Sequence, residues 1–444
     1  MSRPSPARVV ATRVLERVTA DEAFADLALD GELDRRRLTA RDRALATELV
    51  YGTLRWQRYL DWILAPHSKR PLEALDPLPL VLLRVTAYQI AFLERVPAFA
   101  AVNDAVSLAR HAKPGVDAFV NAVMRSFARR GAREREPRLP ADPVEALAIR
   151  CSFPTWLTAR WVERYGAEAE DLMRSMNERP PLTLRANTLR LPRERLAERL
   201  GREEGVHTRL TALAPQGVIV DHAGSPAGWR SFTEGLFAIQ DEGSMLVTHL
   251  LEPVAGQTVA DVCAAPGTKT TQLAQLMDNR GRILAFDPQP RRLGLVADAA
   301  ARLGVTIVEA LAGTAEALAP AFVDRCDAVL VDAPCSSLGV LRRNPEVKWR
   351  RRPSDIGAAA ARQRAILAAA ATMVRPGGRL VYATCSLEPE ENDDVTRAWL
   401  SARPDFRPDP PTAFPIPLAD GTLRCLPHRY GTDGFTAVRF RRIV

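Results

Sequence analysis

The stretch TVADVCAAPGTKT, residues 258–270, decides the fold of the carboxyl-terminal half of the chain. A β-rich run, Thr258–Val262, leads into a turn of small residues with one glycine, and a helix-like stretch begins at Thr270. Small residues let backbone N–H groups approach a ligand at the amino end of the next helix. The turn matches neither G-x-G-x-x-G nor G-x-x-x-x-G-K-[ST], so it carries no signature for NAD or ATP. An ordinary tight turn is the alternative.

Strand-like and helix-like stretches alternate after this turn. The β-rich runs are residues 258–262, 283–286, 305–308, 328–331 and 380–383, and the helix-like stretches are 270–277, 291–303, 356–373 and 390–400. This alternation predicts an α/β domain with a mostly parallel sheet that is covered by helices on both faces. Ligands of such sheets bind at the carboxyl ends of the strands, so we expect the functional site there.

The preceding residues predict two further domains. Residues 7–130 carry apolar residues at helical spacing without β-alternation, which predicts an all-α domain with helix N-caps at Asp21 and Thr39. The run from Arg129 to Asp142 is rich in Arg, Glu and Pro and is typical of a linker. A small α+β module follows, with helices at 156–165, 168–177 and 193–200 and strands at 182–187 and 217–220. The predicted domains are residues 1–135, 143–235 and 236–444.

Charge and cysteine content limit the class of protein. The net charge of +8 on 444 residues favours an anionic partner, with nucleic acid before a membrane surface. Six cysteines form no C-x-x-C pair and no histidine stands at zinc-ligand spacing, so we expect reduced thiols and no metal. The most apolar run, residues 78–93, contains Arg84 and is too short to span a bilayer. The N-terminus lacks the apolar core of a secretory signal, so we expect a cytoplasmic protein. We also expect it to be a monomer.

Two cysteines follow strand-like runs at the expected functional edge. Cys335 ends the sequence D-A-P-C, and Cys385 lies in A-T-C-S. Two thiols beside Asp332 indicate that sulfur takes part in the chemistry of the site. The alternative is that both cysteines are buried and structural. Asp287 ends the second strand about 20 residues after Gly267, where an acid commonly binds ribose hydroxyls. A helix N-cap is the alternative for Asp287.

A basic segment, LRRNPEVKWRRR at residues 341–352, follows Cys335 closely. Basic side chains around an aromatic ring suit phosphate contacts and base stacking. The candidate RNA-binding residues are Arg342, Arg343, Lys348, Trp349 and Arg350. A solvated loop without a partner is the alternative.

In combination these motifs resemble the Sun/NOL1/NOP2 family of RNA cytosine-5 methyltransferases, over residues 180–444. The matching pieces are residues 261–270, D-A-P-C-S-S at 332–337, N-P-E at 344–346, Y-A-T-C-S at 382–386, Q-D-E-G-S at 240–244 and D-G-F at 433–435. The amino-terminal helices, with residues 43–55 and 119–125, look like a NusB-type RNA-binding domain. The fusion is similar to bacterial members of the family that modify 16S rRNA.

The resemblance implies a Rossmann-like methyltransferase domain that uses S-adenosyl-L-methionine to methylate C5 of a cytosine in 16S rRNA. It implies that the thiolate of Cys385 adds to C6 of the base and that Cys335 assists release of the enzyme. Asp332 would hydrogen-bond the base at N3. Lys269 would contact the cytosine or the developing charge, with a surface lysine as the alternative.

The resemblance also implies a cofactor site, with two departures from the family pattern. Its residues would be Cys263, Ala264, Ala265, Pro266, Gly267, Thr268, Lys269, Asp287, Arg292, Thr314 and Asp332. Thr268 stands where the family usually has a second glycine. Thr314 is the polar side chain offered where the family usually has an aspartate that recognises the adenine amino group.

Two other functions remain open at this point. A DNA cytosine-5 methyltransferase would use the thiol of the P-C motif as nucleophile, so Cys335 alone would be essential and Cys385 dispensable. An RNA-binding assembly or antitermination factor would be built around residues 1–130, with a decayed transferase domain. Loss of S-adenosyl-L-methionine binding would favour this last function.

Overall fold

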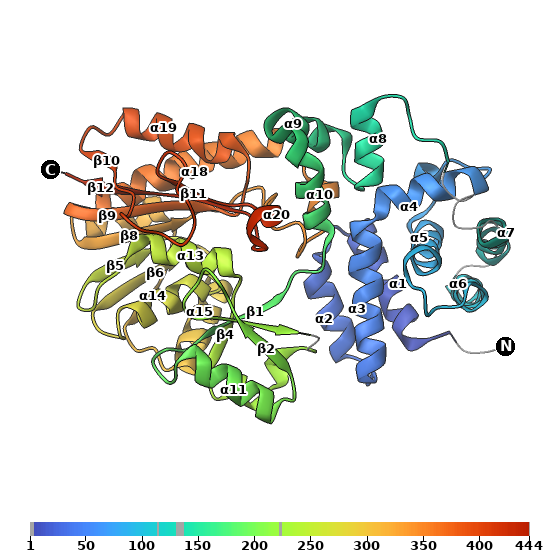
Figure 1. Ribbon diagram of the computed structural model, residues 1–444, viewed down its shortest axis with the longest axis horizontal. Coiled ribbons are helices and arrows are strands. Elements are labelled where there is room, and N and C mark those ends of the chain that lie inside the picture. The colour runs from blue at the N-terminus through green and yellow to red at the C-terminus, as the bar shows by residue number, and fades with distance from the viewer. Residues whose placement is uncertain (1–3, 113–114, 130–136, 222–223, 444) are drawn as a thin grey trace. The chain divides into compact units, whose positions relative to one another are not determined.

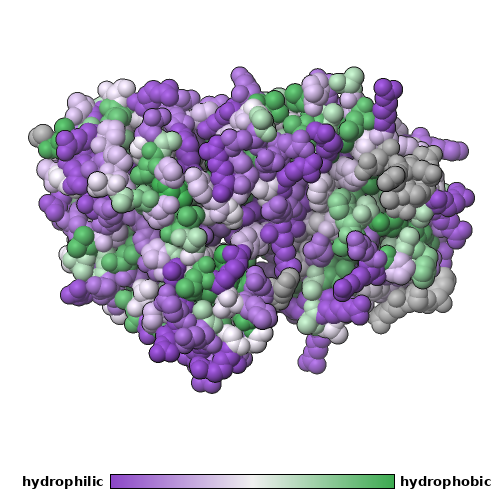
Figure 2. Space-filling view, in the orientation of Figure 1, coloured by the Kyte–Doolittle hydropathy of each residue, from purple (hydrophilic) through white to green (hydrophobic). Residues whose placement is uncertain are grey.

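The computed structural model describes residues 4–112, 115–129, 137–221 and 224–443, which fall into two compact units (Figure 1). Unit 1 comprises residues 1–178 and 341–350, and unit 2 comprises 179–340 and 351–444. Half of the predicted linker, residues 130–136, lies outside the described part of the chain. Within the described residues, no helix has the length and apolar character that a bilayer crossing needs. The face drawn in Figure 2 carries mostly hydrophilic side chains, with apolar residues in small patches.

Unit 1 is helical, as the sequence predicts. Its helices are α1 (Pro6–Ala20), α2 (Ala25–Asp34), α3 (Ala40–Arg55), α4 (Gln57–Leu64), α5 (Pro77–Phe92), α6 (Ala98–Ala112), α7 (Val116–Arg129), α8 (Pro143–Arg150), α9 (Thr155–Tyr165), α10 (Ala169–Asn177) and α17 (Val347–Arg350). Thr39 is the N-cap of α3, because its hydroxyl accepts the N–H of Asp42. The second predicted N-cap is wrong: Asp21 ends α1, since its N–H donates to the carbonyl of Arg17.

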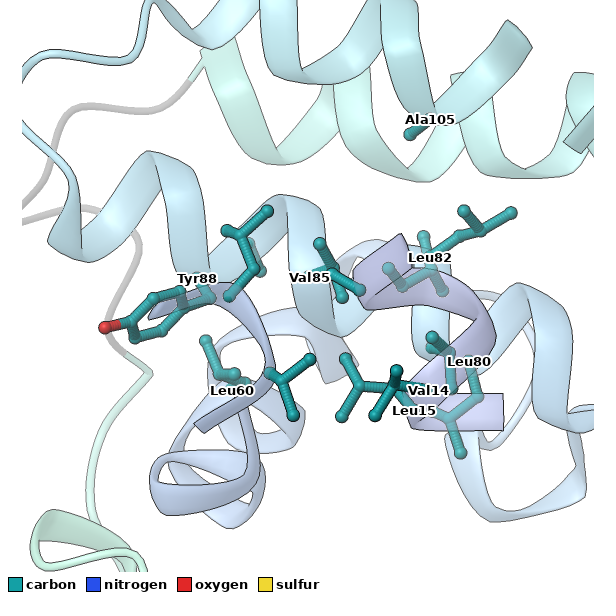
Figure 3. Packing of buried hydrophobic residues seen from close by; sticks show 14 of the residues in the cluster. Val14, Leu15, Leu60, Leu80, Leu82, Val85, Tyr88 and Ala105 are labelled. Atoms are coloured by element: carbon teal, nitrogen blue, oxygen red, sulfur yellow. The ribbon is translucent and has the colours of Figure 1, made fainter. Parts of the chain in front are cut away.

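The core of unit 1 is built from buried residues of α1 to α7. Side chains such as Val14, Leu60 and Val85 point toward one another and are buried (Figure 3). Gly52 of α3 lets α5 approach closely, because a Cβ there would lie 2.1 Å from Cζ of Tyr88. A larger residue at position 52 would therefore displace the Tyr88 ring or force the two helices apart.

Unit 2 contains two sheets. The smaller sheet has the order β2-β3-β1-β4 and is antiparallel. Its elements are β1 (Leu182–Ala186), α11 (Arg193–Glu203), β2 (His207–Leu210), β3 (Gly217–Asp221), α12 (Arg230–Thr233) and β4 (Phe237–Ile239). Helix α11 covers one face of this sheet through Leu196 and Leu200. The predicted strands and the predicted helix at 193–200 of the α+β module lie here, whereas its predicted helices at 156–165 and 168–177 are α9 and α10 of unit 1.

The larger sheet carries the methyltransferase-like half of the chain. Its strands are β5 (Thr258–Asp261), β6 (Arg282–Asp287), β7 (Val308–Ala312), β8 (Cys326–Asp332), β9 (Val374–Thr384), β10 (Phe406–Pro408), β11 (Thr422–Cys425) and β12 (Phe435–Arg442). Its helices are α13 (Glu242–Leu251), α14 (Thr268–Leu276), α15 (Pro290–Leu303), α16 (Ala315–Leu318), α18 (Pro353–Met373), α19 (Asp393–Ser401) and α20 (Pro427–Tyr430). The strand order is β10-β12-β9-β8-β5-β6-β7, and β11 pairs with β12.

Helices cover both faces of the larger sheet, as expected. Strands β5 to β9 are parallel, whereas β10, β11 and β12 add antiparallel pairs that the sequence did not reveal. Successive residues of one strand enter different cores: Val329 packs with α18, and Leu330 packs with α13 and α14. Figure 1 shows α18 and α19 on one side of the strands and α13 and α14 on the other.

One predicted strand is placed wrongly. The run 305–308 was expected to be a strand, but β7 begins only at Val308. Gly304 has φ +72 and ends α15, and the N–H of Val305 donates to the carbonyl of Ala300. Val305 therefore belongs to the helix C-cap, and the strand starts three residues later.

A buried arginine joins the smaller sheet to the larger domain within unit 2. The guanidinium of Arg185, on β1, donates to Oε1 of Gln275 at 2.9 Å, to Oγ1 of Thr271 at 2.9 Å and to the carbonyl of Thr268 at 2.6 Å. Arg185 is fully buried, and burial lowers its pKa to about 9. These bonds connect β1 to the first two turns of α14, which follows the turn at 262–267.

The substitution Arg185→Met is expected to destabilise unit 2 by about 3 kcal/mol or more, because four acceptors, Oε1 of Gln240 among them, lose their donor. Urea unfolding at pH 7 measures this loss. Arg209→Met, at an exposed position of β2 in the same sheet, is the matched control and should change stability by less than about 0.5 kcal/mol. Equal stability of the two variants would contradict this role of Arg185.

Candidate active site

The two predicted thiols lie side by side at the carboxyl ends of neighbouring parallel strands. β8 ends at Asp332 and β9 ends at Thr384, and the register places Asp332 opposite Ala383. The chain after each strand therefore brings Cys335 and Cys385 together, with 3.2 Å between their Sγ atoms. The two cysteines are partly buried, and both are reduced.

The contact between the thiols makes them chemically different. A hydrogen bond from Cys335 lowers the pKa of Cys385, and Ser337 and Lys269 act in the same direction against the effect of burial. The same hydrogen bond, together with burial, raises the pKa of Cys335 well above its usual value. These shifts make Cys385 the more acidic thiol of the pair and Cys335 the less acidic one.

A half-buried ion pair stands next to the thiols. Nζ of Lys269 donates to Oδ2 of Asp332 at 2.7 Å and lies 5.0 Å from the ring centre of Phe435. Burial opposes the charge of Lys269, but Asp332 outweighs it and raises the lysine pKa. Lys269 thus remains an ammonium donor inside the site rather than a surface lysine.

Two glycines allow the loops around Cys385 to meet. Gly339 donates to the carbonyl of Cys385 at 2.8 Å and accepts from the N–H of Gly434 at 2.8 Å. A Cβ on Gly339 would lie 2.4 Å from the carbonyl oxygen of Gly434. Only a residue without a side chain fits at this crossing.

A cavity of about 560 Å³ opens at this edge of the sheet. Nine of the predicted site residues line it: Cys263, Ala265, Lys269, Asp287, Arg292, Thr314, Asp332, Cys335 and Cys385. Four predicted cofactor residues do not line it: Ala264, Pro266, Gly267 and Thr268. Lining residues to which the sequence assigned no role include Gln289, Ser337, Val340, Arg362, Ile366 and Phe435. The D-A-P-C-S-S and D-G-F motifs already contained Ser337 and Phe435, whereas Arg362 and Ile366 had no local signal.

One end of the cavity has the polar groups that a nucleoside needs. Asp287 is buried at the end of β6, where Oδ1 accepts the N–H of Gln289 at 2.9 Å and Oδ2 lies 3.7 Å from Nη1 of Arg292. Gly267, with φ +100, begins α14 and packs against α15, since a Cβ there would lie 2.9 Å from Cα of Val296. This carboxylate beside a close backbone turn fits a bound ribose.

The two departures from the family pattern do not close the cavity. The side chain of Thr268 is not part of the lining, and its carbonyl accepts from Arg185. Thr314 lines the cavity but also caps α16, because its Oγ1 accepts the N–H of Ala317 at 3.3 Å. The site therefore has room for the cofactor, with one hydroxyl where the family usually has a carboxylate.

A buried carboxylate beneath the site has a raised pKa. Oδ2 of Asp261, on β5, accepts the hydroxyl of Thr270 at 2.7 Å, whereas Oδ1 has no partner among the described residues. Burial raises the pKa of Asp261 to about 6. The ionised carboxylate therefore costs stability at neutral pH.

The substitution Asp261→Asn should raise the stability of unit 2 at pH 8 by up to about 3 kcal/mol, since one pKa unit corresponds to about 1.36 kcal/mol. The folded pKa exceeds the unfolded one, so the aspartate protein gains stability as the pH falls through 6 toward 4. The difference between the proteins should shrink over the same range. Urea unfolding at pH 8, 6 and 4.5 measures it, and a constant difference would contradict the raised pKa.

The predicted RNA-binding segment is packed inside unit 1. Nζ of Lys348 is buried and donates to the carbonyl of Arg55 at 2.7 Å and to Oδ1 of Asn177 at 2.8 Å. Burial, with the charge of Arg55, lowers the pKa of Lys348 well below its usual value. Trp349 donates from Nε1 to the carbonyl of Leu54 at 2.7 Å.

The other candidates in this segment are partly engaged as well. Arg350 donates to the carbonyls of Val18 and Ala23 at 3.0 and 2.6 Å. Arg342 is buried, and Arg343 is half-buried. These contacts favour a structural role for Lys348, Trp349 and Arg350, and RNA contact through the segment stays a prediction.

Three family models match the chain in order. They are the NusB family at residues 5–129, the ferredoxin-like domain of Methyltr_RsmF/B-like proteins at 153–226, and the 16S rRNA methyltransferase RsmB/F model at 248–441. The chain is 37% identical to the probable ribosomal RNA small subunit methyltransferase B of Bacillus subtilis over 446 residues, which cover 98% of each protein. It is 34% identical to ribosomal RNA small subunit methyltransferase B of Pseudomonas putida over 406 residues, or 90% of each.

Solved structures also resemble this chain. The crystal structure of PH0851 has a TM-score of 0.86 and 29% identity, and each chain is covered completely. NSun6 from Pyrococcus horikoshii with SFG has a TM-score of 0.60 and 25% identity, over 66% of this chain and 99% of the other. The predicted fold and the predicted cofactor, S-adenosyl-L-methionine, are confirmed. The chain therefore belongs to the 16S rRNA methyltransferase RsmB/F family.

Proposed function

We propose that the protein methylates C5 of a cytosine in 16S rRNA through a covalent adduct between Sγ of Cys385 and C6 of the base. The observation that carries the proposal is the 3.2 Å contact of the two thiols beside the Lys269–Asp332 pair, at the wall of one cavity. Cytosine C5 is a poor nucleophile toward a methyl donor, and addition of a thiolate at C6 turns the ring into an enamine.

In the first step the Cys385 thiolate forms the S–C6 bond and N3 gains a proton. Asp332 faces N3 in this proposal and passes to it a proton that comes from Lys269 through their 2.7 Å hydrogen bond. The raised pKa of Lys269 keeps an ammonium available for this transfer. S-adenosyl-L-methionine, when bound, would supply the methyl group to C5 and leave as S-adenosyl-L-homocysteine.

In the last step a base removes the proton from C5, the S–C6 bond breaks, Cys385 leaves as the thiolate, and N3 returns its proton to the Asp332–Lys269 pair. Cys335 is the group nearest to the departing sulfur. Its pKa is high chiefly because it donates to the Cys385 thiolate. Adduct formation consumes that negative charge, so Cys335 becomes a stronger acid, gives its proton to solvent, and as a thiolate takes the proton from C5. The two thiols thus work in sequence.

Asp287 and Arg292 hold the cofactor in this proposal, with the Asp287 carboxylate on its ribose hydroxyls. Cys263, Ala265 and Thr314 line the same cavity. The match of residues 5–129 to the NusB family and the net charge of +8 support an RNA substrate. We propose that the protein acts on rRNA in the cytoplasm as a monomer.

The test is methyl transfer from labelled S-adenosyl-L-methionine to unmodified 16S rRNA, followed by bisulfite sequencing of the product. We expect one cytosine to become resistant to deamination and to carry the label. A label on a ribose, on another base atom or on DNA alone would contradict the proposal. The DNA enzyme alternative also requires Cys335 to be the thiolate, which is opposite to the direction of the pKa shifts.

A further inference from the structure

A buried carboxylate lies behind the two thiols and outside the cavity lining. Glu391 is fully buried in the turn after β9, and its carbonyl accepts the hydroxyl of Tyr382 at 2.6 Å. Oε1 of Glu391 accepts the N–H of Ser336 at 2.7 Å, and Oε2 accepts the hydroxyl of Ser336 at 2.5 Å. Oε2 also accepts the hydroxyl of Ser386.

The residues that Glu391 holds are the immediate neighbours of the thiols. Ser336 follows Cys335 and Ser386 follows Cys385, and their hydroxyl oxygens lie 3.2 Å apart. One carboxylate therefore ties together two loops that are 50 residues apart in sequence. A shift of either loop would break a charge-assisted hydrogen bond in a site without water access.

A second side chain completes the support. Nε2 of Gln363, on α18, donates to Oε1 of Glu391 at 3.1 Å and to the carbonyl of Pro334 at 3.0 Å. Pro334 precedes Cys335, so the loop is held on both sides of the thiol. Glu391 also places a negative charge near Cys335, which helps to keep that thiol protonated by raising its pKa, after the effects of Cys385 and burial.

We propose that Glu391 is a positioning residue that sets the spacing of Cys335 and Cys385 and thereby decides which of the two sulfurs is the nucleophile. It touches neither substrate nor cofactor, and it acts through Ser336 and Ser386. The inference rests on the proposed function and extends it, because it names the residue on which the different roles of the two thiols depend.

The test reads the thiols directly and needs no methyl transfer. Full-length protein is treated with limiting iodoacetamide between pH 6 and pH 10, and peptide mass spectrometry gives the alkylation rate of each cysteine. In the wild type Cys385 should react faster than Cys335 at pH 7. In Glu391→Ala this preference should fall by about tenfold, which corresponds to about one pKa unit for Cys385.

Conservative and control variants separate positioning from folding. Glu391→Gln keeps the length of the side chain and should retain more of the preference for Cys385 than Glu391→Ala. Asp394→Asn changes an exposed carboxylate three residues later, on α19, and should leave the alkylation profile unchanged. Thermal melting and calorimetric binding of S-adenosyl-L-methionine show which variants are folded. If Glu391→Ala does not fold, Ser386→Ala serves as the test of positioning, because it removes the hydrogen bond between the Ser386 hydroxyl and the Glu391 carboxylate.

In the methyl-transfer assay, Glu391→Ala should lower kcat by about 10²-fold, as for a misplacement of reacting groups, while KM for rRNA changes less than about threefold. If folded Glu391→Ala keeps the wild-type preference for Cys385, the positioning role is overturned. Where only Ser386→Ala folds, the same result in that variant overturns it. Absence of 5-methylcytosine in the wild-type product would instead overturn the proposed function, and the alkylation profile would still decide the role of Glu391.

Discussion

Replacement of Cys385 by alanine is expected to lower methyl transfer by about 10⁴-fold or more, in the range found when a catalytic nucleophile is removed. The thiolate that the Cys335 hydrogen bond stabilises is then missing, and no other group at the cavity wall has a lowered pKa among the described thiols. Single-turnover transfer of labelled methyl groups to 16S rRNA measures the effect.

Cys151→Ala is the control for this variant. Cys151 lies in unit 1, and burial raises its pKa to about 11, so it should contribute nothing to transfer. Cys385→Ser should be inactive as well, since a hydroxyl of similar size is a far weaker nucleophile at neutral pH. Turnover of Cys385→Ala at more than a few per cent of the wild-type rate would exclude the proposed mechanism.

Cys335→Ala should instead stop the reaction after methyl transfer. The base for the C5 proton is missing, so the S–C6 bond cannot break, and turnover should fall by about 10²- to 10⁴-fold. Most of the enzyme should accumulate as a protein–RNA adduct that survives denaturing electrophoresis. The double variant Cys335→Ala/Cys385→Ala should form no adduct, and an adduct in that variant would refute the roles of the two thiols.

The same variant should shift the pH dependence of adduct formation. The hydrogen bond from Cys335 is the largest factor that lowers the pKa of Cys385. Without this hydrogen bond the pKa of Cys385 rises. As the pH is lowered, adduct formation should therefore be lost at a higher pH in Cys335→Ala than in the wild type. An unchanged profile would show that the thiol–thiol contact does not control Cys385.

The sequence was sufficient to place the two thiols at one edge of the sheet, because its signals are local. The runs that end at Asp332 and Thr384 are apolar and β-branched, and parallel strands place their carboxyl ends at one edge. Periodicity failed at Val305, where the cap of α15 extends past Gly304. It also missed β12, because Arg439 and Arg441 stand in its interior and only distant partners such as Asp409 make them acceptable there.

Long-range contacts account for the remaining differences. Lys348 and Trp349 look like exposed basic and aromatic residues in the sequence, but their partners are Leu54, Arg55 and Asn177. Glu391 lies in S-L-E-P-E-E-N, where three glutamates look equivalent. Only the fold shows which of them faces the serines that follow the two thiols.

The segment 341–350 has a consequence for synthesis of the chain. Unit 1 includes this segment, yet it is translated some 160 residues after α10. The nascent amino-terminal helices therefore emerge from the ribosome with the carbonyls of Leu54 and Arg55 still lacking their later donors. We expect a fragment that stops at residue 178 to be less stable than the same helices in the complete protein, and a synthetic 341–350 peptide to bind that fragment and restore part of the loss.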